Sequence, residues 1–329
     1  MSGPALETPV VICIFDRPDM TKQVLEAIAP ARPRQLFVIA DGPRTLEEAD
    51  RCAQALATTE KPGWETEVHY DVSRVNIGAR RRFDTGIRWV FSQVEEAIVF
   101  EDDCIPDTTF FPFCESLLER YRHDTRVMMI SGGNYLQRWK DDRQSYHFSR
   151  FGSTYGWATW RRAWMFYDTR MLAWGNPEVR RSIREYLADE EVYGLQAPRF
   201  ERIYADVNDR HCWDLQWVFA RLEQRGLAIV PAVNLVSNIG NVGGRGLPPG
   251  HPLASIPTTP LRLPLRSPDQ VAPDDEYDRL HVRRIRPSAG PGKRRRWANP
   301  LAPVVDRIGE ALRKGLNRDS GALETNAPT

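Results

Sequence analysis

The chain has 329 residues, of which 41% are hydrophobic and 27% charged, so it can bury one sizeable α/β core with appendages. Its formal net charge of +1 gives no general attraction to nucleic acid, and no nucleic-acid partner is expected. Five cysteines form an odd set without metal-ligand spacing, and we recognise neither a signal peptide nor an apolar run that could span a bilayer. A cytoplasmic setting is therefore expected.

Strand and helix patterns alternate along the first hundred residues. Short β-branched or apolar runs predict strands at 10–15, 36–40, 67–72 and 97–100, and apolar residues at helical spacing predict helices at 20–28, 46–56 and 79–94. Strands that alternate with helices specify an α/β fold with a mainly parallel central sheet, flanked by helices and joined by right-handed crossovers.

Polar residues follow each of these strands. They are Asp16-Arg17, Asp41-Gly42, Asn76-Ile77-Gly78 and Glu101-Asp102-Asp103. Because the carboxyl ends of parallel strands open on one edge of a sheet, the four groups are expected to meet in one ligand-binding crevice. Taken singly, Arg17 could be a surface ion-pair partner and Asp41 an ordinary turn former.

The acidic group is a candidate metal site. A buried strand cannot hold carboxylates in its apolar interior, so the acids at its end project into the crevice, where they could hold a divalent cation against a diphosphate. The alternative is that Asp102 and Asp103 cap the helix that follows the expected turn at Cys104 to Asp107, although Asp107 is itself placed to do so.

At these residues the chain resembles the nucleotide-diphospho-sugar transferases of the GT-A fold, in particular the family 2-like enzymes and N-acetylglucosaminyltransferase I. The likeness covers about residues 8 to 255. It is carried by the order of four motifs: Cys-Ile-Phe-Asp-Arg-Pro (13–18), Ala-Asp-Gly (40–42), Glu-Asp-Asp-Cys-Ile-Pro-Asp with Phe-Phe after it (101–111), and Trp-Asp (213–214).

The resemblance implies roles for particular residues. Nucleotide contacts fall to Phe15, Arg17 and Asp41, the ribose and diphosphate to Glu101 and Asp102, and the metal, Mn²⁺ or Mg²⁺, to Asp103. The family usually has an aliphatic residue where this chain has Cys104, a departure that leaves the expected chemistry unchanged.

Seven of the ten tryptophans lie between Trp139 and Trp217. Tryptophan this concentrated is typical of a core, yet indoles also stack on the apolar faces of sugars. The expectation is a mixed core and acceptor wall, with Trp157 and Trp213 as acceptor-binding residues.

Asp214 precedes apolar residues at helical spacing, which predict a helix that ends near Gly226. An aspartate there is commonly an N-cap. In inverting members of the family an aspartate at such a helix start accepts the proton of the acceptor hydroxyl, so the resemblance implies that Asp214 is the general base.

The segment from Asn238 to His251 is rich in glycine and ends in two prolines before Gly250, so it is expected to be a loop rather than a dinucleotide-binding turn. By resemblance to loops that cover the donor, Arg245 could contact the diphosphate and His251 could complete the metal shell. Arg80, Arg81 and Arg82 are expected to form a charge run on a helix surface, with phosphate contact as the alternative.

Beyond residue 255 the character changes. Residues 256–297 are expected to form a Pro-rich and basic linker, and residues 298–329 an amphipathic helix followed by a disordered end. The apolar face of that helix has two open roles: docking on the catalytic domain, or peripheral contact with the inner membrane face.

The expected activity is metal-dependent transfer of a hexosyl or N-acetylhexosaminyl group from a nucleoside diphosphate donor, with uridine the expected base, to a glycan or lipid-linked acceptor. A nucleotidyltransferase acting on a sugar phosphate is one alternative, but it would need a Gly-rich basic loop where this chain has Asp16 to Asp19. A non-catalytic carbohydrate-binding protein is another, and it leaves the acidic group unexplained.

Overall fold

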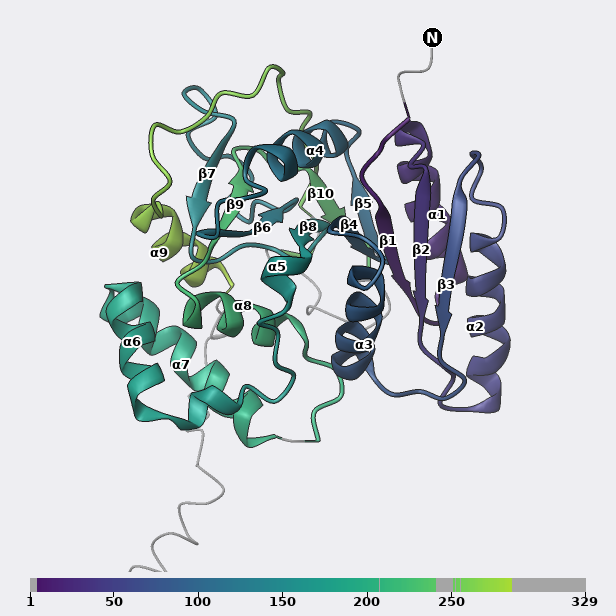
Figure 1. Cartoon of the computed structure of the whole chain (residues 1–329), viewed down its shortest axis with the longest axis horizontal. Coiled ribbons are helices and arrows are strands. Elements are labelled where there is room, and N and C mark those ends of the chain that lie inside the picture. The colour runs from purple at the N-terminus through teal and green to yellow at the C-terminus, as the bar shows by residue number, and fades with distance from the viewer. Residues whose placement is uncertain (1–4, 207, 241–250, 252, 255, 286–329) are drawn as a thin grey trace, which may run out of the picture. The chain divides into compact units, whose positions relative to one another are not determined.

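A computed structural model describes residues 5–206, 208–240, 251, 253–254 and 256–285. An eight-stranded sheet in the order β3-β2-β1-β4-β8-β6-β9-β7 runs through the centre (Figure 1). Its strands are β1 (Val10–Ile14), β2 (Gln35–Ala40), β3 (Glu67–Val72), β4 (Glu96–Glu101), β6 (Val127–Ser131), β7 (Tyr146–Ser149), β8 (Trp157–Trp160) and β9 (Leu227–Pro231).

The first four strands are parallel, as the alternating pattern predicts. In register, Val10 of β1 lies opposite Leu36 of β2 on one side and Ile98 of β4 on the other. Beyond β4 the sheet becomes mixed, because β8 is antiparallel to both β4 and β6, and β7 is antiparallel to β9. The predicted class, an α/β fold with a mainly parallel central sheet flanked by helices, is confirmed.

Alternate residues of the strands supply two separate hydrophobic clusters, because successive side chains point to opposite faces of a sheet. On one face Ile12 and Val38 pack with helices α1 (Pro18–Ile28), α2 (Leu46–Thr59) and α4 (Phe110–Arg120). On the other, Val11 and Ile39 pack with α3 (Ala79–Phe91), α5 (Arg161–Trp164) and α8 (Asp214–Glu223).

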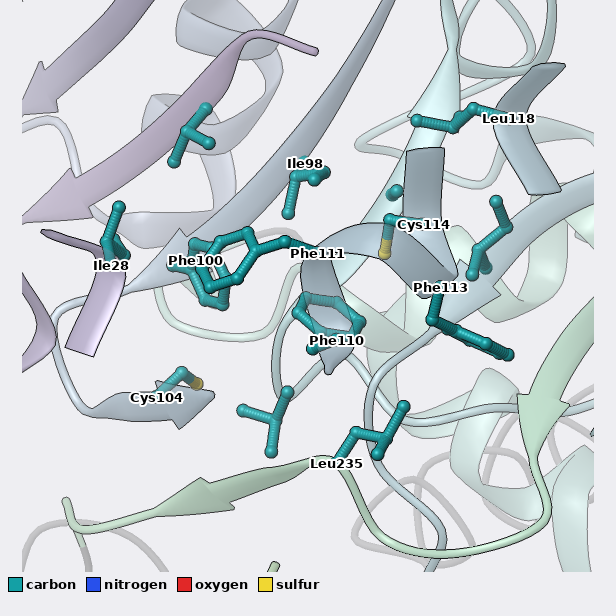
Figure 2. Packing of buried hydrophobic residues seen from close by; sticks show 14 of the residues in the cluster. Ile28, Ile98, Phe100, Cys104, Phe110, Phe111, Phe113, Cys114, Leu118 and Leu235 are labelled. Atoms are coloured by element: carbon teal, nitrogen blue, oxygen red, sulfur yellow. The ribbon is translucent and has the colours of Figure 1, made fainter. Parts of the chain in front are cut away.

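The segment after the acidic group is a short strand rather than the expected turn. Strand β5 (Cys104–Pro106) pairs antiparallel with β10 (Val236–Asn238), a partner that lies far along the chain. Asp107 then accepts hydrogen bonds from the amide and hydroxyl of Thr109, so it closes a turn before α4 instead of capping the helix. Figure 2 shows Phe110 and Phe111 at the start of α4, packed against Phe100 of β4.

A third hydrophobic cluster joins helices α6 (Pro177–Leu187), α7 (Glu190–Ala205), α8 and α9 (Asp275–Arg284). Two 3-10 turns, Ala29–Ala31 and Leu172–Gly175, complete the regular elements of the described chain. Helix α9 falls in the stretch expected to be a linker, and the first compact unit extends over Met1–Arg286. The helix lacks an aliphatic stripe, because its buried positions are Tyr277, Asp278, His281 and Val282.

The predicted helix and disordered end at residues 298–329 lie outside the described residues. Among the residues described, no helix is both long and apolar enough to cross a membrane.

Candidate active site

A pocket of about 470 Å³ opens at the carboxyl edge of the parallel strands, a size typical of small-molecule sites. It lies where the chain, having run outward from β1 to β2 and β3, crosses back to place β4 on the other side of β1, which is the switch point where open α/β sheets bind ligands. Residues from all four expected strand-end groups line it: Phe15, Asp16, Arg17, Asp41, Asn76, Gly78, Glu101, Asp102 and Asp103.

Arg17 is bound to the acidic group. Its Nη1 donates to Asp103 Oδ2 at 2.7 Å and to Asp102 Oδ1 at 3.4 Å. The Phe15 amide lies 3.4 Å from the other oxygen of Asp102. The strand ends therefore do meet, and the ion-pair partner of Arg17 is the acidic group itself rather than an unrelated surface residue.

The acidic group carries more negative charge than Arg17 can balance. Burial, and then repulsion by Asp103, raises the pKa of Asp102 to about 7, although Arg17 acts in the opposite direction. Burial also raises the pKa of Glu101, helped by Asp103, Asp102 and Asp214, while a hydrogen bond from the Trp213 side chain partly offsets the shift. A second positive charge brought into this pocket would therefore be stabilised.

The segment from Asn238 to Gly240 closes over Asp103. Asn238 Nδ2 donates to Asp103 Oδ1 at 2.9 Å, and the Ile239 amide donates to the Asp103 carbonyl at 2.8 Å. A Cβ built at Gly240 would lie 1.9 Å from Asp103 Oδ2, so only glycine lets the backbone come this close. No local pattern identifies Asn238 as a site residue, because its position depends on the long-range pairing of β10 with β5.

The donor set suits a cation that is completed by substrate. Within the described residues, no group of three or more His, Cys, Asp or Glu side chains is arranged as a metal cage. Magnesium, however, is commonly held by one or two carboxylates together with substrate phosphates and water. Asp103, with Asp102 beside it, meets that requirement. His251 lies in the described chain, where its Nδ1 accepts from the Leu253 amide at 3.2 Å, and Arg245 lies outside it.

Asp41 fixes a turn at the edge of the pocket. Its carboxylate accepts hydrogen bonds from the Gly42, Ile77 and Gly78 amides and from Asn76 Nδ2, at 2.9 to 3.0 Å. The observed role is thus the fixing of the turn before α3, which keeps Asn76 and Gly78 at the pocket edge. A direct contact between Asp41 and a nucleotide stays a prediction.

The expected surface charge run at Arg80 to Arg82 is wrong for two of its three members. Arg80 and Arg82 are buried, and Arg81 alone is exposed. Arg80 donates to the carbonyls of Thr169, Asp206 and Asp209. Arg82 donates to the Ala40 carbonyl and pairs with Asp71 at 2.8 Å, while it also lines the pocket. Residues 80 and 82 point to different sides of the helix. Each arginine is buried there because backbone or carboxylate oxygens accept its hydrogen bonds.

Arg44 is a pocket residue that the sequence pattern did not single out. Its guanidinium lies 5.2 Å from the ring centroid of Phe15 and pairs with Glu48 of α2. Together with Arg17 and Arg82, it places three guanidinium groups in the lining of the pocket. Such a pocket suits a ligand that carries both an aromatic ring and phosphates.

Asp214 lies at the start of α8, as predicted, without capping it. The N-cap residue is Trp213, which makes no side-chain cap, and Asp214 Oδ1 is 3.4 Å from the thiol of Cys212. The carboxylate raises the pKa of Glu101 in the large pocket, and it also lines a second, smaller pocket of about 70 Å³. Asp214 therefore lines the smaller pocket and acts on the large pocket only through its charge.

The expected acceptor wall of tryptophan is corrected to a buried core. The side chain of Trp157 is fully buried, Trp213 is 4% exposed, and Trp213 stacks on Phe83 with ring centroids 3.9 Å apart. Trp157 lies against Trp164, Trp213 and Trp217 in the cluster beneath the sheet. Neither indole presents a face to a sugar, because burial of these large rings stabilises the core instead.

Comparisons with known proteins come from structure alone. No family model matches the sequence, and no curated protein does. The chain is similar to apo UDP-glucose pyrophosphorylase, with a TM-score of 0.33 and 8% identity over 70% of this chain and 93% of that chain. It is similar to UDP-glucose pyrophosphorylase complexed with UDP-glucose, with a TM-score of 0.32 and 8% identity over 69% and 91% of the two chains.

Proposed function

We propose that this protein is a metal-dependent glycosyltransferase that uses a nucleoside diphosphate sugar, with UDP as the nucleotide part. The observation that carries the proposal is the placement of Asp214. Its carboxylate contributes to the negative charge felt by Glu101 of the large pocket, and it lines the second cavity. A base close to both substrate sites is what direct transfer to a hydroxyl requires.

The large pocket would hold the donor. The guanidinium groups of Arg17, Arg44 and Arg82, which line the pocket, suit the diphosphate, and Phe15 offers a ring for the base to stack on. Asp103, with Asp102 beside it, would hold Mn²⁺ or Mg²⁺, whereas His251 does not line the pocket. When bound, such a cation supplies the positive charge that stabilises a departing diphosphate. Arg17 must then share or release Asp103, and the diphosphate is the natural new partner for its guanidinium.

Asp214 would act on the acceptor. As the acceptor hydroxyl oxygen bonds to the anomeric carbon, the bond from that carbon to the diphosphate oxygen breaks, and the diphosphate leaves with the bonding electrons. The hydroxyl proton passes to Asp214. Attack from the side opposite the diphosphate inverts the configuration at the anomeric carbon. The carboxylate makes no capping hydrogen bond to α8 in the described chain, and only the weak thiol donor of Cys212 contacts its Oδ1.

The first strand argues against nucleotidyl transfer. Strand β1 ends at Ile14 and α1 begins at Pro18, so the connection is Phe15-Asp16-Arg17. It contains no glycine, and three residues are too few to wrap the triphosphate of a nucleotide with backbone amides.

Calorimetry with UDP, with and without Mn²⁺, tests the donor site. Mn²⁺ should tighten UDP binding to the natural protein, and Asp103→Asn should remove that gain by about tenfold or more because a charged ligand is lost. Asp142→Asn, which alters an exposed acid that pairs with Arg143, should behave like the natural protein. Unchanged metal dependence in Asp103→Asn would exclude this residue as the metal ligand.

Product analysis separates the two enzyme classes. Slow hydrolysis of UDP-sugars in the absence of acceptor should release UDP. Formation of UTP from a UDP-sugar and pyrophosphate would instead show nucleotidyl transfer and would overturn the proposal.

A further inference from the structure

The second cavity, here called the α7–α9 pocket, is lined by side chains from several elements. They are Tyr135, Phe151, Thr154, Gln196, Arg199, Asp214, Leu215, Val218, His281 and Ile285, with the backbone of Gly152. A volume of about 70 Å³ has room for a few non-hydrogen atoms but not for a whole sugar ring. It thus suits one substituent of a larger molecule.

Arg199 is a cation on this pocket without an acidic partner. Its Nη1 donates to Gln196 Oε1 at 3.1 Å, and no carboxylate in the described chain lies within ion-pair distance of it. Burial lowers the pKa of Arg199, while Asp214 partly compensates through space. Partial burial of an unpaired guanidinium is costly, and an anion that entered the pocket would remove the cost.

His281 supplies a second polar atom that lacks a partner. The side chain is 2% exposed, and its ring stacks with those of Tyr135 and Phe151, with centroids 5.0 and 5.8 Å away. Its Nδ1 is buried and makes no hydrogen bond. Burial lowers the pKa of His281 to about 3, so the ring is neutral at pH 7 and can offer one N–H to an acceptor oxygen.

We propose that the α7–α9 pocket binds an anionic substituent of the acceptor, a carboxylate or a phosphate, through Arg199 and His281, and so presents a neighbouring hydroxyl to Asp214. The inference rests on the proposed function and adds to it the chemical class of the acceptor. With Arg199 paired to a ligand anion, this cation would not form an ion pair with Asp214. An ion pair between Arg199 and Asp214 would hold the carboxylate in its charged form and weaken it as a proton acceptor.

Small anions test the pocket without knowledge of the acceptor. The full-length protein, free of metal so that phosphate has no cation to bind at Asp103, is titrated in separate arms with acetate and inorganic phosphate. Binding is followed by the NMR signal of the arginine side-chain N–H groups. At least one anion should bind with millimolar affinity, and the arm that binds more tightly identifies carboxylate or phosphate as the natural group.

Three variants make the result specific. Arg199→Gln should weaken binding by about tenfold or more, and Arg199→Lys should keep part of it, because a charged donor remains. Arg202→Gln removes an exposed arginine from the same helix, one that does not line the pocket, and should bind like the natural protein. Binding of neither anion, or equal binding to the Arg199→Gln and Arg202→Gln variants, would overturn the inference.

The proposed function can be refuted independently of this inference. A parallel titration with UDP and Mn²⁺ reports the large pocket in the same preparations. If the natural protein binds the anion but not UDP, the donor site is refuted and the anion result stands. If it binds UDP but neither anion, only the proposed class of acceptor is refuted.

Discussion

The acidic residues of the candidate active site carry negative charge that their neighbours do not fully compensate. Three consecutive acids face one arginine, so burial and mutual repulsion raise the pKa of Glu101 and Asp102. A folded protein keeps such a cluster at a cost in stability, which the binding of a cation and an anionic ligand would reverse. Asp214 is different, because no hydrogen bond to the helix engages its carboxylate.

Asp214→Asn tests the base at the residue scale. The amide keeps the shape of the side chain but cannot accept the proton, so transfer should fall by about two to four orders of magnitude. UDP binding should persist, and the melting temperature should change little, since Asp214 does not cap α8. Steady-state transfer measured per folded molecule checks this, with Asp142→Asn as a charge-matched control. Lost stability with normal turnover would show a structural role instead.

At the scale of elements, the sequence predicted what is decided locally. The strands and helices of the first hundred residues lie within a few residues of their expected positions, because apolar period and turn residues are local signals. The meeting of Arg17 with Asp103 also followed, since parallel strand ends must share an edge. The sequence could not predict the pairing of β5 with β10 or the contact of Asn238 with Asp103. Both join segments more than a hundred residues apart.

Helix α9 and the α7–α9 pocket escaped prediction for a related reason. The helix packs through Tyr277, His281 and an ion pair of Asp278 with Arg150 at 2.9 Å, none of which forms an aliphatic stripe. The prediction that Trp157 and Trp213 bind the acceptor was wrong, because composition does not distinguish an indole in a core from one on a surface. No local signal distinguishes Arg199 from the other arginine of its helix.

The packing of α9 on β7 predicts a dependence of stability on pH. Burial lowers the pKa of His147 and of His281 to about 3, and His147 lies 4.1 Å from the Tyr277 ring. Below the usual histidine pKa near 6.5, these two side chains bind a proton in the unfolded chain but stay neutral in the folded chain. Each histidine should therefore lower the free energy of unfolding as pH falls from about 6.5 toward 3. Asp278, whose pKa is raised to about 6, works in the opposite direction over part of that range.

A single substitution isolates the histidine contribution. Between pH 7 and pH 5, His147→Phe should lose about 2 kcal/mol less unfolding free energy than the natural protein. Urea unfolding at the two pH values measures the difference, in which the contribution of Asp278 cancels. His123→Phe, at an exposed position, should keep the natural pH dependence. Equal slopes for all three proteins would mean that His147 can be protonated in the folded state.

At the scale of the whole molecule, the first compact unit carries every candidate site residue of the described chain. It extends over Met1–Arg286, and both pockets lie within it. Its sheet is covered on both faces by helices, so this unit has its own hydrophobic core. The sequence from residue 293 to 296 is Lys-Arg-Arg-Arg, and it precedes apolar residues at helical spacing.

Truncation after Gly290 separates these two parts of the chain. The shortened protein should melt at the natural temperature and bind UDP with Mn²⁺ as before, because all proposed site residues precede the cut. Binding to vesicles should be lost, since basic residues near an anionic surface contribute about 1 kcal/mol each and the apolar face adds to them. Sedimentation with anionic and with neutral vesicles at low and high salt measures this. Pelleting should occur only for the full-length chain on anionic vesicles, and should weaken with salt. Equal pelleting of both proteins, or of neither, would assign the tail no role at a membrane.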